Sequence, residues 1–120
     1  MNLEILKKFK APQSHINEIA EASKKQGDTS ELEMEQTKIL FKLFNPVGAG
    51  TWYVYEIFDD GVAMCFALLD EPMFAECGTI SFNEMASLKL PFGLTIELDR
   101  SFPIGEKTLK EVYEEVKGEF

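Results

Sequence analysis

Two apolar segments joined by a short acidic turn constrain the fold of this chain more than any other feature. Residues 51–58 are rich in aromatic and β-branched side chains, and residues 62–69 are apolar almost throughout. The intervening Asp59-Asp60-Gly61 contains an Asp-Gly pair, which is typical of a tight β-hairpin. Because both segments carry apolar residues on both faces, we expect this hairpin near the centre of a sheet that is covered on both sides.

Helical and strand patterns around the hairpin predict a single α+β domain over residues 1–120, a length typical of one domain. Residues 1–36 are expected to form a helical N-terminal extension, with a helix from about Ser14 to Gln26 that ends at Gly27. The other expected elements are a helical turn before Pro12, strands at 37–44, 77–80 and 94–98, a short helix opened by Ser81-x-x-Glu84 with Met85 and Leu88 facing inward, and a terminal helix opened by Thr108-x-x-Glu111. The predicted fold is therefore a mainly antiparallel sheet of four to five strands with N-terminal, inserted and C-terminal helices.

The net charge of −9 lies entirely in the second part of the chain. Residues 1–55 hold seven acidic and seven basic side chains, whereas residues 56–120 hold fourteen acidic and five basic ones, and no Lys or Arg occurs between Lys42 and Lys89. Such a region either presents a surface to a basic partner protein or forms a solvated acidic face that aids solubility. It disfavours direct binding to nucleic-acid phosphate. The candidate partner-binding residues are Glu56, Asp59, Asp60, Asp70, Glu71 and Glu76.

The sequence lacks the motifs of common catalytic, metal and cofactor sites. The single histidine, His15, lies at an expected helix start, and we interpret it as an exposed structural residue. Cys65 and Cys77 are too few for a disulfide framework, and with one histidine they make no compact zinc motif. Gly48-Ala49-Gly50 precedes a strand instead of a helix, which disfavours dinucleotide binding. We therefore expect a non-enzymatic protein with no catalytic residue, no metal and no cofactor.

The distribution of apolar residues also bears on location. No apolar run approaches the roughly 20 residues that span a bilayer. The first ten residues carry charges throughout and have no apolar core of the kind that a signal peptide needs. The sequence therefore predicts a cytoplasmic protein without a membrane partner.

A second charged cluster, Glu97, Asp99 and Arg100, occurs at the end of the strand expected at residues 94–98. One interpretation is a surface salt bridge or turn, since exposed pairs of this kind contribute only about 0–1 kcal/mol. The alternative is a small ligand-binding or hydrolase-like site, in which Glu97 or Asp99 acts beside Tyr55 as a general acid or base. A buried Glu97 in a deep pocket would favour that alternative.

Exposed aromatic or apolar side chains offer a third kind of site. If one sheet face around Trp52 and Tyr55 stays uncovered, the protein would act as an oligomer through that face. Met73 and Phe74 follow Pro72 at a break in the sheet, and we expect a neighbouring loop to cover them.

Several short motifs follow one another over residues 37–113. They are Phe41-Lys42-Leu43-Phe44-Asn45-Pro46, then Thr51-Trp52-Tyr53 with Glu56, then Phe66-Ala67-Leu68, then Gly78-Thr79-Ile80-Ser81-Phe82-Asn83-Glu84, and finally Gly93-Leu94-Thr95-Ile96-Glu97-Leu98-Asp99. Their order and spacing resemble a bacterial family described as domain of unknown function 2958. Thr79 stands where that family usually has an aromatic residue and Leu98 where it usually has arginine, and residues 1–36 match poorly.

The resemblance implies a protein carried by plasmids and other mobile elements, often beside antirestriction genes. Some relatives are grouped with inhibitors of CRISPR nucleases, and no catalytic activity carries over from the family. Together with the charge pattern, the resemblance suggests an acidic binding module of antirestriction or anti-CRISPR type. Its carboxylates would occupy a nuclease channel that evolved for phosphates, which requires acidic residues in rows on one face.

Overall fold

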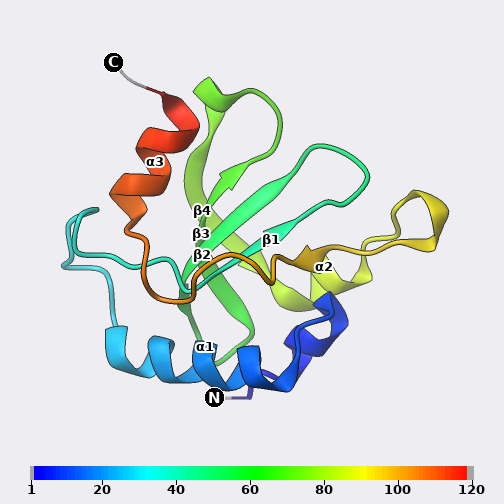
Figure 1. Cartoon of the computed structure of the whole chain (residues 1–120), viewed down its shortest axis with the longest axis horizontal. Coiled ribbons are helices and arrows are strands. Elements are labelled where there is room, and N and C mark those ends of the chain that lie inside the picture. Colours follow the sequence, from blue (N-terminus) through cyan, green and yellow to red (C-terminus); the bar gives the residue numbers. More distant parts are fainter. Residues whose placement is uncertain (1, 119–120) are drawn as a thin grey trace.

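The computed structural model describes residues 2–118, and within them five strands form one antiparallel sheet in the order β4-β3-β2-β1-β5 (Figure 1). The strands are β1 (Phe41–Phe44), β2 (Thr51–Ile57), β3 (Val62–Leu68), β4 (Glu76–Ser81) and β5 (Glu97–Leu98). The helices are α1 (Gln13–Gln26), α2 (Phe82–Ser87) and α3 (Leu109–Lys117), with 3₁₀ turns η1 (Glu4–Phe9), η2 (Pro72–Phe74) and η3 (Pro91–Gly93). The predicted α+β fold is confirmed, with its N-terminal, inserted and C-terminal helices.

The hairpin that the sequence predicts is β2–β3, and both strands are interior strands of the sheet. Its turn closes with a hydrogen bond of 2.8 Å from the Phe58 amide to the Val62 carbonyl oxygen. Gly61 has a φ of 82°, in the left-handed region where glycine carries no steric penalty. The Asp-Gly pair therefore forms the turn because glycine adopts the left-handed conformation that the turn requires.

The sheet separates two hydrophobic clusters, so both of its faces are covered as expected. The first cluster lies against η1, α1 and α2, and its largest buried side chains include Phe9, Phe41 and Phe82. The second cluster lies against α3 and includes Phe66 and Val112. Trp52 belongs to the first cluster and Tyr55 to the second, and both are buried. The aromatic face considered as an oligomer contact is therefore part of the interior.

A bulge in β2 sets the direction of the side chains at the end of this strand. The register with β3 shifts between Val54 and Glu56. Val54 and Ile57 consequently pack in the first cluster, whereas Tyr55 packs in the second. The extra residue turns Glu56 toward the side of the sheet on which α3 lies, where Glu56 pairs with Met64 of β3.

Several element boundaries differ from those expected. The strand expected at 37–44 is regular only over Phe41–Phe44, because Lys38 instead forms an isolated bridge with Thr108. The strand expected at 94–98 is reduced to Glu97–Leu98. Leu88, which we expected to face inward, is 45% exposed because α2 already ends at Ser87.

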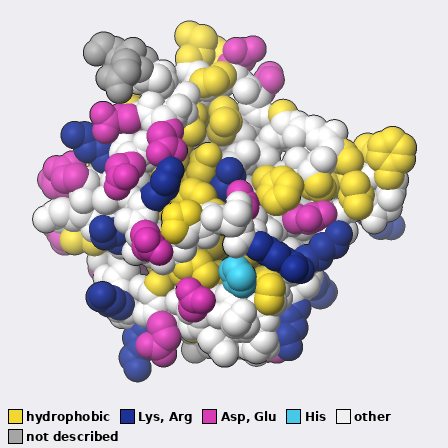
Figure 2. Space-filling view, viewed as in Figure 1, with side chains coloured by type: hydrophobic (Ala, Val, Ile, Leu, Met, Phe, Trp, Pro, Cys, Tyr) yellow, Lys and Arg dark blue, Asp and Glu magenta, His cyan; other side chains and the backbone are white. Residues whose placement is uncertain are grey.

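The connection from α2 to β5 projects from the molecule and has a hydrophobic tip (Figures 1 and 2). Phe92 is 90% exposed and has a φ of 64°, and Gly93 follows with a φ of 71°. The Leu94 amide closes the turn by donating to the Pro91 carbonyl oxygen over 3.3 Å. Two successive left-handed residues define a turn that favours Asn-Gly, so phenylalanine is an unfavourable residue at its first position.

Replacing Phe92 with asparagine is therefore expected to raise the free energy of unfolding by about 1 kcal/mol. Asparagine tolerates the left-handed conformation, and the exposed ring loses no packing when it is removed. Urea denaturation of the two proteins measures the difference. A loss of about 1 kcal/mol or more would show instead that the ring stabilises the fold.

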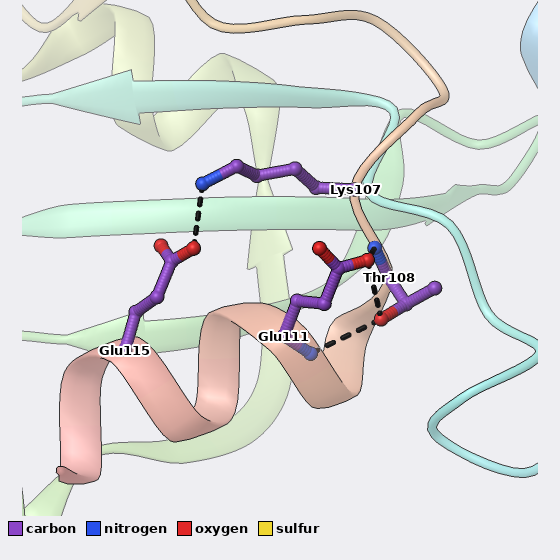
Figure 3. Close-up of polar contacts among 4 residues, drawn as sticks. All are labelled: Lys107, Thr108, Glu111 and Glu115. Carbon is purple, nitrogen blue, oxygen red and sulfur yellow. Dashed lines mark hydrogen bonds and ion pairs between the residues drawn. The ribbon is translucent and has the colours of Figure 1, made fainter.

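The C-terminal helix α3 begins with the capping box that the sequence predicts (Figure 3). The Glu111 amide donates to Thr108 Oγ1 over 3.1 Å, and the Thr108 amide donates to Glu111 Oε1 over 3.1 Å. The hydrogen bonds that the Thr108 amide and hydroxyl donate to the Glu111 carboxylate lower the pKa of Glu111. An ion pair of 2.6 Å joins Lys107, which precedes the helix, to Glu115 within it. With its start fixed in this way, α3 places Leu109 and Val112 in the second cluster.

Candidate protein-binding site

Strand β4 forms one edge of the sheet and is the strand around which the candidate site is built. It pairs with β3 over six residues without a break, and α2 continues directly from its end. Glu76, Cys77 and Thr79 are exposed. An edge strand of this kind leaves backbone N–H and C=O groups on its outer side without a partner strand.

Two adjoining cavities lie along β4. The first has a volume of about 360 Å³ and the second about 340 Å³. Thr79 and Ile80 line both, so the two hollows meet at this strand. We call the two cavities together the β4 furrow. The furrow is lined by Trp52, Val62, Cys65, Ala67, Leu69, Asp70, Glu71, Phe74, Glu76, Cys77, Gly78, Thr79, Ile80, Ser81, Glu84, Met85 and Leu88.

The charge of the β4 furrow has one sign. Asp70, Glu71, Glu76 and Glu84 line it, and no Lys or Arg does. Across residues 2–118, none of these four carboxylates accepts a hydrogen bond or forms an ion pair. All four residues are exposed, so their charges are available to a partner.

Apolar side chains stand beside these charges. Leu69, Phe74 and Leu88 are 58%, 72% and 45% exposed, and the nearly buried Trp52 lies at the inner wall. Figure 2 shows hydrophobic and acidic side chains next to one another over the β3–β4 connection, at the top of the view. The furrow therefore combines apolar surface with unpaired negative charge, a combination that suits a segment with apolar and basic side chains.

The expectation that a loop covers Met73 and Phe74 is wrong, since they are 70% and 72% exposed. The buried residue of this connection is Ala75, which packs into the second cluster. Lys117 of α3 donates to the Met73 carbonyl oxygen over 2.8 Å. These two contacts hold the connection in place while its large apolar side chains point to solvent.

The six predicted partner-binding residues do not lie together. Asp70, Glu71 and Glu76 line the first cavity of the furrow. Asp59 and Asp60 lie in the β2–β3 turn, at the opposite end of β3, which at about 3.3 Å per residue is about 20 Å away. The Asp60 carboxylate accepts a hydrogen bond of 3.1 Å from the Val62 amide within that turn. The structure therefore gathers half of the predicted set and does not form one row from all six.

Glu56 has a role inside the fold. Its carboxylate is half-buried and accepts hydrogen bonds from the Thr29 amide over 3.0 Å and from the Thr29 hydroxyl over 2.5 Å. These bonds join the segment after α1 to β2. Glu56 thus holds a loop against the sheet, and its Oε1 atom is already engaged by two donors.

Replacing Glu56 with alanine is expected to lower the free energy of unfolding by about 1–2 kcal/mol, because the Thr29 amide and hydroxyl lose a charged acceptor. Urea denaturation measures this loss. Ligand binding at the β4 furrow should not change, since Glu56 does not line it. A variant of unchanged stability would contradict the structural role of Glu56.

The alternative site predicted from Glu97, Asp99, Arg100 and Tyr55 does not form, because Tyr55 lies apart from the contacts of the other three. Glu97 lies 3.1 Å from Lys10 and Asp99 lies 3.4 Å from Lys42, each in an ion pair. The Arg100 guanidinium donates to the Lys10 carbonyl oxygen over 2.8 Å. Glu97 and Asp99 therefore form salt bridges, as one interpretation of the sequence expects, and Arg100 forms a hydrogen bond to the backbone. Tyr55 is absent from these contacts, because it is buried in the second cluster.

The pKa shifts agree with a structural role for these groups. Burial would raise the pKa of Asp99, but hydrogen bonds from Ser101 and the charge of Lys42 outweigh it and hold the pKa below its ordinary value. Burial, followed by the hydrogen bond with the Cys77 thiol, raises the pKa of Tyr55. The Asp99 carboxyl is therefore ionised and the Tyr55 hydroxyl protonated near neutral pH, and neither is tuned toward proton transfer there.

The other features considered in the sequence are His15, a possible metal site and a possible membrane span. His15 is half-buried instead of exposed, and its Nε2 lies 3.2 Å from the Arg100 carbonyl oxygen. Among residues 2–118, no three His, Cys, Asp or Glu side chains are placed to hold a metal ion. In the same part of the chain, no helix is both long and apolar enough to cross a membrane.

Comparison with known protein families adds a second line of evidence. A family model described as "Protein of unknown function (DUF2958)" matches residues 12–116, which is most of the chain. The chain belongs to this family. The DUF2958 match begins at residue 12 and so includes α1 as well as the motifs from residue 37 onward. Comparisons with curated proteins and with solved structures give no match.

Some residues of the furrow in this DUF2958 protein are not selected by sequence patterns. Glu84 forms part of a capping motif in the sequence, yet here only its amide is used, donating to Ser81 Oγ over 3.3 Å. Leu69 belongs to an apolar run that predicts a buried strand, but β3 ends one residue before it. The available signal was the absence of Lys and Arg between residues 42 and 89, an interval that contains every residue of the furrow.

Proposed function

We propose that this DUF2958 protein is a non-enzymatic binding module whose β4 furrow receives a basic, partly apolar segment of a partner protein. The observation that carries the proposal is the meeting of Asp70, Glu71 and Glu76 with the exposed side chains of Leu69 and Phe74 in one cavity. Within the described part of the chain, none of these three carboxylates has a salt-bridge partner. Exposed apolar surface beside charge of one sign is typical of protein interfaces and is costly to maintain without a partner.

The chemistry of the furrow also narrows the partner class. Nucleases present Lys and Arg in the channels that bind phosphate, and such channels attract acidic proteins. A host defence nuclease therefore fits the charge of the furrow, in agreement with the mobile-element setting that the family resemblance implies. Because Asp59 and Asp60 lie in the β2–β3 turn, about 20 Å from the first cavity, the proposed mode is capture of one basic segment instead of mimicry of a long phosphate row.

The chain carries two natural reporters for a test of this function. Its only tryptophan, Trp52, lines the first cavity, and Cys77 is exposed on β4. Cys65 also lines that cavity but is buried, and burial raises the pKa of its thiol to about 12, so that it stays protonated. A thiol reagent is therefore expected to modify Cys77 and to spare Cys65 in the folded protein.

The experiment uses the synthetic basic peptide Lys-Thr-Leu-Thr-Val-Lys and the acidic peptide Glu-Thr-Leu-Thr-Val-Glu. The basic peptide is expected to change the fluorescence of Trp52 in a saturable way and to slow the modification of Cys77. Its affinity should fall about 10-fold between low and high salt, because screening weakens exposed charge pairs. The acidic peptide should have neither effect. Equal binding of both peptides, or binding of neither, would overturn the proposal.

A further inference from the structure

The two edges of the sheet differ in how they are protected against pairing with another strand. Edge strands in soluble proteins are usually short, bulged, or supplied with Lys or Pro. β5 follows this pattern, since it has two residues and ends beside the Lys42–Asp99 ion pair. β4 has six residues in unbroken register with β3 and contains no Lys and no Pro. The β4 edge is therefore open to strand addition.

Gly78, in the middle of β4, has no structural reason to be glycine. It is not among the residues with positive φ, so its backbone conformation is open to any L-residue. A Cβ atom at this position would meet no atom within 4 Å. Glycine inside a strand weakens it and often marks a place where a ligand or another chain approaches closely. Gly78 lies opposite Cys65 and lines the furrow, so it leaves an open notch there.

We propose that the segment bound in the β4 furrow adds to the sheet as a sixth strand alongside β4, with a bulky apolar side chain over Gly78. This inference rests on the proposed function and specifies how the partner binds. Backbone hydrogen bonds to the outer edge of β4 supply affinity, and alternate side chains supply specificity. Glu76, Gly78 and Ile80 lie on one face of β4, so the matching face of the partner carries a basic, then an apolar, then an apolar residue.

Charge decides between a foreign segment and a second copy of this chain as the added strand. Pairing β4 with β4 would bring Glu76 of each copy, and the acidic residues beside it, to one interface without Lys or Arg in either furrow. Each copy also has a net charge of −9. Like charges oppose such a dimer, whereas a segment with Lys or Arg is attracted. The occupant is therefore a basic extended segment of another protein.

Two N-methylated forms of the basic peptide test the backbone contact. Alternate N–H groups of an added strand point toward β4 and the others point to solvent. Methylating the two threonine amides blocks one set, and methylating the leucine and valine amides blocks the other, with side chains and charge unchanged. We expect one form to bind as well as the parent peptide and the other to bind at least about 10-fold more weakly. Parent binding should also slow amide hydrogen exchange in β4.

The outcomes separate this inference from the proposed function. If both methylated forms bind like the parent peptide, strand addition is wrong, but the proposal that the furrow binds a basic segment still holds. If the parent peptide does not bind, both proposals fail. Sedimentation of the free chain as a dimer that the peptide dissociates would show a second copy on β4 and would overturn the choice of occupant.

The variant Gly78→Val tests the notch independently. Valine favours strand conformation and its Cβ atom would meet no atom within 4 Å here, so folding should be unimpaired and the midpoint of urea denaturation should stay equal or rise. Peptide affinity should fall at least about 10-fold because the notch is filled. Thr51→Val in β2 is the control, since it adds β-propensity at a strand position that does not line the furrow. Equal affinity of Gly78→Val and the unmodified protein would overturn the placement of a side chain over Gly78.

Discussion

The double variant Asp70→Lys/Glu76→Lys is expected to bind the basic peptide about 10- to 100-fold more weakly than the unmodified protein at low salt. Both carboxylates line the first cavity and neither has a salt-bridge partner among the residues that the structure describes, so reversal replaces two attractions with two repulsions. The difference should shrink at high salt, because the screening length falls to a few ångströms. Titration followed by Trp52 fluorescence at two salt concentrations measures both effects.

A matched control is available in the same chain. Asp59→Lys/Asp60→Lys makes the same change in net charge, but its residues lie at the other end of β3, about 20 Å from the first cavity of the furrow. At that distance and moderate salt its effect on affinity should be less than about 3-fold. Equal losses in the two double variants would mean that overall charge, and not the furrow, attracts the peptide.

Replacing Phe82 with alanine is expected to lower the free energy of unfolding by about 3–5 kcal/mol. Phe82 is 1% exposed and begins α2 directly after β4. Its ring centroid lies 6.3 Å from that of Phe9 and 6.1 Å from that of Phe41. Removal of the ring leaves a cavity where η1, α2 and β1 meet, and three elements lose a shared contact.

The exposed Phe92 gives the control for this substitution. Phe92→Ala removes the same ring from a position that is 90% exposed, and stability should change by no more than about 0.5 kcal/mol. Urea denaturation of both variants compares a buried and an exposed phenylalanine in one chain. A loss of less than about 1 kcal/mol for Phe82→Ala would show that α2 does not depend on this contact.

Sequence patterns predict those parts of the fold that depend on neighbouring residues. The β2–β3 turn follows from Asp-Gly, the end of α1 from Gly27, and the start of α3 from Thr108 and Glu111, because each depends on contacts within a few residues. The exposure of Leu88 could not be predicted in this way. It depends on where α2 stops, and the Ser81 cap fixes only where α2 begins.

The candidate site could be predicted only in part, because it depends on the order of strands in the sheet. The charge pattern selects Asp70, Glu71 and Glu76, which do meet at one cavity. It also selects Glu56, but the direction of this side chain is set by the bulge in β2, which cannot be predicted from the residue types. The position of β4 at an edge of the sheet follows from pairing between distant segments, and so does the placement of Gly78 where another chain could approach it.

The contact between Lys117 and the Met73 carbonyl oxygen has a practical consequence. It ties the last turn of α3 to the connection that carries Phe74, so the rim of the furrow is anchored by a residue close to the end of the chain. A fusion that strains the last turn of α3 would loosen the rim without touching any residue that lines it.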